Sequence, residues 1–156
     1  MGPARMVPET LDFERLQNEG DWAFRLEMVR MIDPSQLHEI MQDPHWMVRL
    51  EVAKRIDPSR VHEMRGDEDW MVRREVTRRV DPSLLASSMF DPDWRVRQEV
   101  ASLIDPSRLP EMMGDEHWAV RLEVAKKISS RFLSYLLMME TRLGVVKILE
   151  NRLNLV

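Results

Sequence analysis

Apolar residues recur along most of the chain with the spacing of a helix. In the stretch up to residue 56, Val48, Val52 and Ile56 stand four positions apart, with Ala53 beside them and charged residues in between. At about 100° per residue these side chains fall on one half of a helical cylinder. The pattern predicts an amphipathic α-helix of about three turns, and it returns in each of five copies along the chain.

Each predicted long helix follows an aspartate. Asp43 has a side chain suited to an N-cap, and Pro44 suits the first helical position because its φ is fixed and it has no N–H to satisfy. We therefore expect the second of these helices to begin after Asp43 and to end near Ile56. The aspartates assigned as caps in the five copies are Asp21, Asp43, Asp67, Asp91 and Asp115.

A second helix start follows each long helix. The tripeptide Asp-Pro-Ser occurs at residues 33–35, 57–59, 81–83 and 105–107, and it again combines a cap with a proline at the first helical position. About eight residues remain before the next aspartate, which is room for one or two turns, partly of 3₁₀ geometry. No strand pattern competes. The expected repeat is a long helix followed by a short one.

The tryptophans set the length of this repeat. All five stand 24 residues apart, without insertion or deletion, at Trp22, Trp46, Trp70, Trp94 and Trp118. A fixed period of this size is typical of stacked repeat proteins. We expect an all-α solenoid forming a single domain over residues 1–156. It comprises an N-terminal half-repeat (1–20), a five-repeat array (21–128) whose fifth repeat continues into a degenerate second helix, and a C-terminal cap (129–156).

The repeated phrase D-x-x-W-x-V-R-x-E-V-A-x-x-I-D-P-S-x-L resembles the leucine-rich repeat variant family over about residues 9–150. The resemblance implies a right-handed superhelix of alternating α- and 3₁₀-helices without a β-sheet. The V-R-x-x-V-A half of the phrase is also similar to HEAT repeats. A known family member carries an iron–sulfur cluster on an N-terminal segment with cysteines. This chain has no cysteine, so the cluster is not carried over and we expect no cofactor.

Composition narrows the classes of function. The 156 residues carry a net charge of −4, which argues against a phosphate-binding surface over the whole protein. The lack of cysteine excludes disulfides and thiol nucleophiles. The longest nearly apolar run, residues 132–139, is far shorter than the ~20 residues of a membrane span, and the first ten residues lack a signal-peptide core. We expect a cytoplasmic protein that does not contact a membrane.

One arginine recurs on the apolar half of every long helix, and a buried guanidinium requires a partner. The candidates are the cap aspartates or the Asp-Pro-Ser aspartates of the same or a neighbouring repeat, which the planar guanidinium can bind with two hydrogen bonds. We favour a structural ladder over a row that binds anions. The arginines are Arg25, Arg49, Arg73, Arg97 and Arg121.

Three further sets of residues invite a functional interpretation. The tryptophans could form an aromatic platform, but packing at the core or its rim is favoured. The recurring glutamates, such as Glu51, fit a solvated face with (i, i+4) pairs such as Glu51–Arg55, Glu75–Arg79 and Glu123–Lys127 better than an acid catalyst. The four histidines supply no metal-ligand set. No nucleophile and base converge, so we expect neither an enzyme nor a metal site.

Positions that differ between repeats are better candidates for binding. An apolar edge is predicted in the first three repeats, comprising Leu26, Met47, Leu50 and Met71. Methionine-rich surfaces adapt to irregular partners, although these side chains could merely shield the tryptophans. A basic strip is predicted around Arg74, Arg78 and Arg79, beside Arg55, Arg60 and Arg65, and Arg95 continues the position of Met47 and Met71. Nearby Asp67, Glu68 and Asp69 could neutralise it.

The C-terminal segment has a broad apolar face and would suit a homodimer through residues 140–156. Taken together, the sequence favours a non-enzymatic scaffold that binds an unidentified protein partner. The alternative is a HEAT-like protein that binds nucleic acid through the basic strip of the third repeat.

Overall fold

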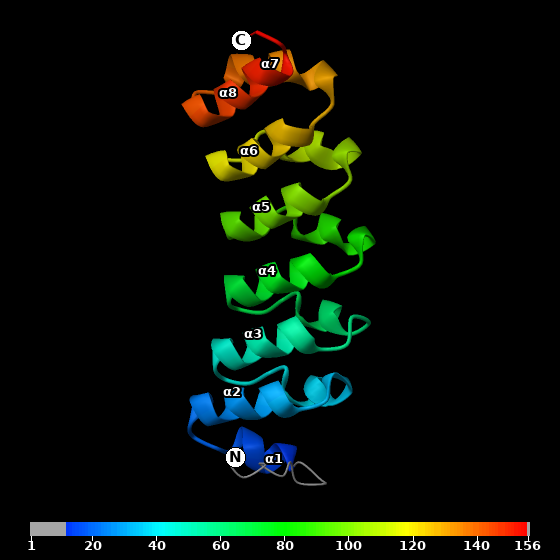
Figure 1. The fold of residues 1–156 in the computed structure, drawn as a ribbon, viewed down its shortest axis with the longest axis vertical. Coiled ribbons are helices and arrows are strands. Elements are labelled where there is room, and N and C mark those ends of the chain that lie inside the picture. Colours follow the sequence, from blue (N-terminus) through cyan, green and yellow to red (C-terminus); the bar gives the residue numbers. More distant parts are fainter. Residues whose placement is uncertain (1–11, 156) are drawn as a thin grey trace, which may run out of the picture. The chain divides into compact units, whose positions relative to one another are not determined.

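The computed structural model describes residues 12–155, and every regular element in that range is a helix (Figure 1). Long α-helices alternate with short 3₁₀-helices, as the two kinds of helix start predicted. The chain forms two compact units, residues 1–79 and 80–156. The predicted all-α repeat fold is confirmed.

The first unit stacks its three long helices side by side (Figure 1). Its elements are α1 (Phe13–Gln17), α2 (Trp22–Met31), η1 (Pro34–Ile40), α3 (Trp46–Arg55), η2 (Val61–Met64) and α4 (Trp70–Arg79). Helix α2 packs on α3 and α3 on α4, while η1 packs on α3 and η2 on α4. Each repeat therefore buries both of its helices against the repeat that follows it.

The second unit repeats this plan. Its elements are η3 (Pro82–Ser88), α5 (Trp94–Leu103), η4 (Pro106–Met112), α6 (Trp118–Lys127), η5 (Ser130–Phe132), α7 (Leu133–Met139) and α8 (Leu143–Arg152). Helix α5 packs on α6 and α6 on α8, with η3 against α5, η4 against α6 and α7 against α8.

The core consists of the predicted apolar rows. Val48, Val52 and Ile56 of the second repeat are fully buried, and Val61 from η2 joins them. Burial of each such side chain stabilises the fold by about 1.5–3 kcal/mol. The spacing of apolar residues therefore identified the buried face of each long helix.

Helix α2 begins after its predicted cap Asp21, but the other four long helices begin later than predicted. Helix α3 starts at Trp46 and its cap is His45, whose Nδ1 accepts the N–H of Met47 at 3.3 Å. Asp43 is not the cap: its Oδ1 accepts the N–H of His45 at 2.8 Å, which makes a turn before the helix. The residue directly before each tryptophan accepts the first-turn N–H instead, at Asp21, His45, Asp69, Asp93 and His117.

The short helices begin as predicted in three copies. Asp33, Asp81 and Asp105 cap η1, η3 and η4, with proline at the helix start. In the second repeat the Asp57 carboxylate accepts the N–H of Ser59 in the same way, but η2 begins only at Val61. Hydrogen bonds from the following serine lower the pKa of all four aspartates.

A sixth repeat, shifted by one residue, forms the C-terminal end. Helix α8 begins at Leu143, with Arg142 as its cap residue, and it packs on α6 as a further repeat would. Val145 and Leu149 are buried in the places of Val48 and Val52. The extra residue explains why the 24-residue register cannot be followed past Trp118 in the sequence.

Candidate interaction surface

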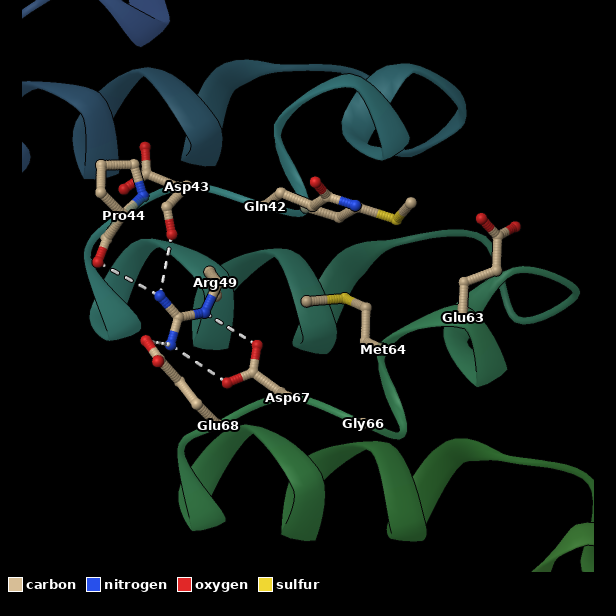
Figure 2. Close-up of a pocket in the computed structure, with 10 residues that line it drawn as sticks. Gln42, Asp43, Pro44, Arg49, Glu63, Met64, Gly66, Asp67 and Glu68 are labelled. Atoms are coloured by element: carbon tan, nitrogen blue, oxygen red, sulfur yellow. Dashed lines mark hydrogen bonds and ion pairs between the residues drawn. The ribbon is translucent and has the colours of Figure 1, made fainter.

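At the junctions described within each unit, an arginine of one repeat pairs with a carboxylate of the next. Arg49 donates from Nε to Oδ2 of Asp67 at 2.8 Å and from Nη2 to Oδ1 at 3.1 Å (Figure 2). Its Nη1 donates to the backbone oxygens of Asp43 and Pro44 at 2.8 and 3.2 Å. Nη2 also reaches Glu68 Oε1 at 3.0 Å. We call this arrangement the arginine rung.

The arginine rung has no spare donor for an outside anion. A guanidinium carries five N–H groups, and these five contacts of Arg49 occupy them. The side chains of Arg49 and Asp67 are only 8% and 6% exposed. The geometry at Arg49 therefore suits a structural pair rather than a site for an outside anion.

The same rung recurs in both units. Nε to carboxylate distances are 2.7 Å for Arg25–Asp43, Arg97–Asp115 and Arg121–Glu140. Glu140 stands one residue later than the register requires, in keeping with the shifted sixth repeat. The Arg121 guanidinium beside it lowers the pKa of the Glu140 carboxyl. Arg73 donates from Nη1 to the backbone oxygens of Asp67 and Glu68 at 2.8 and 3.0 Å, as Arg49 does one repeat earlier.

A second set of basic residues caps the C-terminal ends of the preceding helices. Arg55 donates to the backbone oxygens of Val29 and Ile32, and Arg79 to those of Ala53 and Ile56. Lys127 and Arg152 contact the backbone oxygens of Ser102 and Ala125 in the second unit. Helix ends leave such carbonyls without intrahelical partners and favour positive charge.

These contacts replace the predicted glutamate pairs. Arg55, Arg79 and Lys127 were expected to pair with the glutamate four residues before them, but the carbonyls of the neighbouring helix take their N–H groups instead. The glutamates pair three residues on where a basic residue stands there, as in Glu27–Arg30, Glu75–Arg78 and Glu123–Lys126. The row is only partly solvated, because the Glu27 side chain is 59% exposed but those of Glu75 and Glu123 are 18% and 15% exposed. The described residues contain no group of three or more acidic or histidine side chains that could hold a metal.

The predicted basic strip is largely engaged within the chain. Arg79 caps α3, and Arg78 lies 3.6 Å from Glu75. Arg60 pairs with Glu63 at 2.7 Å, and Arg65 donates to the backbone oxygen of His62.

The remaining arginines predicted to bind a partner are Arg74 of the strip and Arg95 of the second unit. Arg74 is half-buried on α4. Arg95 pairs with Asp93 at 3.1 Å and lies over the ring of Trp94 at 4.9 Å. Most of the basic side chains on which the nucleic-acid alternative depended therefore have partners within the chain.

The tryptophans form an aromatic edge with the cap residues of the next repeat. The rings of Trp22 and His45 are stacked with centroids 4.2 Å apart, and those of Trp94 and His117 are 3.9 Å apart. Each histidine also faces the tryptophan that follows it, at 6.1 and 5.8 Å. The sequence analysis missed this role for the histidines, although their shared place directly before a tryptophan was visible.

The predicted apolar edge lies on neighbouring helices of the first unit. Leu26 comes from α2, Met47 and Leu50 from α3, and Met71 from α4. Met47 is 37% exposed, and the other three side chains are half-buried. The edge therefore combines one exposed methionine with flanking apolar side chains that remain within reach of solvent.

A pocket of about 450 Å³ lies beside the second arginine rung (Figure 2). An equivalent pocket of about 540 Å³ lies beside Arg97 and Asp115. Their walls include the rung itself and the carboxylates of Glu63 and Glu111, which already pair with Arg60 and Arg108. Because the rung arginine has no spare donor, neither pocket suits an anionic substrate.

The C-terminal segment is apolar but partly covered. On α8, Val145 and Leu149 are buried while Leu143 and the following Leu155 are exposed. Val156 lies outside the described residues. The exposed apolar residues of α7 are Tyr135, Met138 and Met139. No helix among residues 12–155 is both long and apolar enough to cross a membrane.

Comparison with known proteins gives one informative similarity. No family model matches the sequence, and no curated protein matches it. A solved structure described as a leucine-rich repeat variant with a novel repetitive structural motif is similar with a TM-score of 0.81 and 29% identity. The similarity covers 92% of this chain and 62% of that one, so the chain spans less than two thirds of its length. The alternating α- and 3₁₀-helices, the 24-residue period and this similarity show that the chain has the repeat fold of that leucine-rich repeat variant.

Proposed function

We propose that the chain is a non-enzymatic scaffold that binds another protein through the apolar edge of its first unit. The observation that carries the proposal is the contrast between recurring and variable positions. The recurring charged residues form ion pairs and hydrogen bonds within the fold, in the arginine rungs and at the helix caps. Met47 instead stays exposed, in the same edge as Leu26, Leu50 and Met71. Methionine is flexible and polarisable, which suits an adaptable contact surface.

The polar groups of the interior support a structural role. Among the described residues, every buried side-chain nitrogen or oxygen has a hydrogen-bond partner. Catalytic sites usually retain a perturbed acid, base or nucleophile in a cleft, and the carboxylates that line the two pockets are paired with arginines. A repeat stack instead supplies contact area in increments.

A matched pair of double variants tests the proposal. Met47→Glu with Met71→Glu places charge on the apolar edge, and Met138→Glu with Met139→Glu places the same charge on exposed methionines of α7. Chemical crosslinking in cells followed by mass spectrometry identifies the partner of the unaltered protein. We expect the first pair to abolish the crosslink and the second to retain it. Retention by both pairs overturns the apolar edge as the contact surface.

A further inference from the structure

In three repeats the residue directly before the long helix lies next to the tryptophan of the repeat before it. His45 stacks on Trp22, and His117 stacks on Trp94. In the sixth repeat Arg142 takes the same place, with its guanidinium 5.1 Å from the ring centroid of Trp118. A planar nitrogen-bearing group from the next repeat therefore covers the indole at three junctions.

The junction between the second and third repeats departs from this rule. Its cap residue is Asp69, whose Oδ1 is held at the helix start by the N–H of Met71 at 2.8 Å. A carboxylate cannot stack as an imidazole or guanidinium does. Within residues 12–155, no ring or cation of the third repeat covers Trp46, which remains half-buried and faces His45 on its other side.

The surroundings of Trp46 are apolar and acidic. Met47 and Met71 directly follow the two tryptophans of this junction in the sequence, and Met47 is exposed. Asp69 brings a carboxylate to the same junction, and the neighbouring Glu68 side chain is 82% exposed. An indole face beside a carboxylate attracts a cation, and a guanidinium can stack on the ring while it donates hydrogen bonds to the carboxylate.

Arginine fits this place better than lysine. Its planar guanidinium can lie flat on the indole while its N–H groups point sideways to a carboxylate, and its methylene stem can pack on methionine. The chain already uses this chemistry, since Arg142 lies over Trp118 and Arg95 over Trp94.

We propose that Trp46 and Asp69 bind an arginine side chain of the protein partner, in the place that Arg142 occupies on Trp118. The partner of this scaffold is then a protein with an arginine in its contact segment. This inference rests on the proposed function and specifies the chemistry of the partner.

Two reciprocal variants isolate the site without removing a cap. Asp69→His places an imidazole next to Trp46, and Nδ1 can accept the Met71 N–H as it does in His45 and His117. His45→Asp does the reverse, because it uncovers Trp22 and sets a carboxylate beside it. Aspartate already serves as a cap at Asp21 and Asp93, so both variants use residues that this position accepts.

The probe is a blocked pentapeptide, Gly-Ser-Arg-Ser-Gly, compared with the same peptide carrying neutral citrulline. The indole N–H signals of the five tryptophans are followed by NMR during titration into the whole chain, with Trp46→Phe used to assign the Trp46 signal. We expect the Trp46 signal to move with the arginine peptide, and citrulline to bind about two- to thirtyfold more weakly, the range of one cation–π contact. Asp69→His should abolish the movement, and His45→Asp should make the Trp22 signal respond.

An unmoved Trp46 signal, an equal response to citrulline, or an unchanged response in Asp69→His overturns the arginine site. The partner crosslink separates this result from failure of the scaffold role. A crosslink that is lost with Met47→Glu and Met71→Glu but unaffected by Asp69→His supports the apolar edge and overturns the arginine site. A Trp46 signal that responds to arginine while the methionine variants keep their partner supports the arginine site and overturns the apolar edge.

Discussion

The two sides of a repeat junction follow different rules. On the buried side, the arginine rung pairs an arginine with a carboxylate at the junctions described in both units, with Nε to carboxylate distances of 2.7–2.8 Å. The carboxylate is an aspartate at three of these junctions and Glu140 at the last. On the aromatic side, the cap position holds a histidine, an aspartate or an arginine, as at His45, Asp69, His117 and Arg142. We therefore expect substitutions on the buried side to cost more stability than substitutions on the aromatic side.

The energetic demands at the two positions explain this difference. A buried guanidinium and carboxylate have lost their water, so each must keep its whole set of partners. The cap position only needs an acceptor for one N–H, which aspartate and histidine both provide. Arg142 provides none, and α8 has no side-chain cap hydrogen bond. Glu140 accepts the N–H groups of Thr141 and Arg142 before the helix at 3.0 and 2.8 Å, much as Asp43 accepts that of His45.

Removal of a rung arginine should have the largest effect. Arg49→Met leaves the buried Asp67 carboxylate without its main partner, and we expect a loss of about 3–5 kcal/mol in the free energy of unfolding. Denaturation by urea, followed by circular dichroism, measures the change. Adding Asp67→Asn should restore part of the loss, because the neutral amide needs no cation and still accepts the Asp69 N–H. Unchanged stability in Arg49→Met would falsify the structural role of the rung.

The rung formed by Arg121 and Glu140 should make the free energy of unfolding depend on pH. Arg121 lowers the pKa of Glu140 below that of an unfolded glutamate, so the pair stabilises the fold at neutral pH, and this contribution is lost as pH falls through the pKa of the folded state. Glu140→Gln should cost about 1.5–3 kcal/mol at pH 7. It should also reduce the further loss between pH 5 and pH 3, about the range where such carboxylates titrate. An identical pH profile for variant and unaltered protein would contradict the coupling.

The carbonyl caps should contribute less than the rungs. Arg55→Leu removes two hydrogen bonds to the end of α2, and we expect a loss of about 1–2 kcal/mol. The chain itself carries Leu103 at the same position of the fourth repeat, so leucine is compatible with the helix. Lys54→Leu, at the adjacent exposed position, is the control and should change stability by less than about 0.5 kcal/mol. Equal losses of stability for the two substitutions would contradict a specific contribution of the Arg55 hydrogen bonds.

The repeat fold could be predicted from the sequence because its signal is periodic. Val48, Val52 and Ile56 identify a buried face by spacing alone, and five tryptophans at one interval exclude a domain with a single central core. The need of Arg49 for a carboxylate also follows from its place on that face. Which carboxylate it binds does not follow, because several aspartates per repeat satisfy the same requirement.

The predicted start of helix α3 was wrong for a related reason. Asp43 suits either a cap or a partner for arginine, and the fold uses it for Arg25 and for the turn at His45. The cap then passes to the residue before tryptophan. Two contacts could not be predicted: that of Arg55 with the end of α2 and that of His45 with Trp22. Both depend on the distance between consecutive helices, which the spacing of residues within one helix does not reveal.

The smallest predicted effect bears most directly on the contrast between the two sides. Asp69→Ala removes a cap and should cost about 1 kcal/mol. Asp69→His loses the favourable charge of aspartate at a helix start, about 0.3–1 kcal/mol, and gains ring contact with Trp46, about 0.5–1.5 kcal/mol. These terms nearly cancel, so its stability in urea should stay within about 0.5 kcal/mol of the unaltered protein. If Asp69→His lowers the free energy of unfolding as much as Asp69→Ala does, the fold itself requires aspartate at this cap position. The presence of Asp69 would then be explained by stability and would not indicate a binding site.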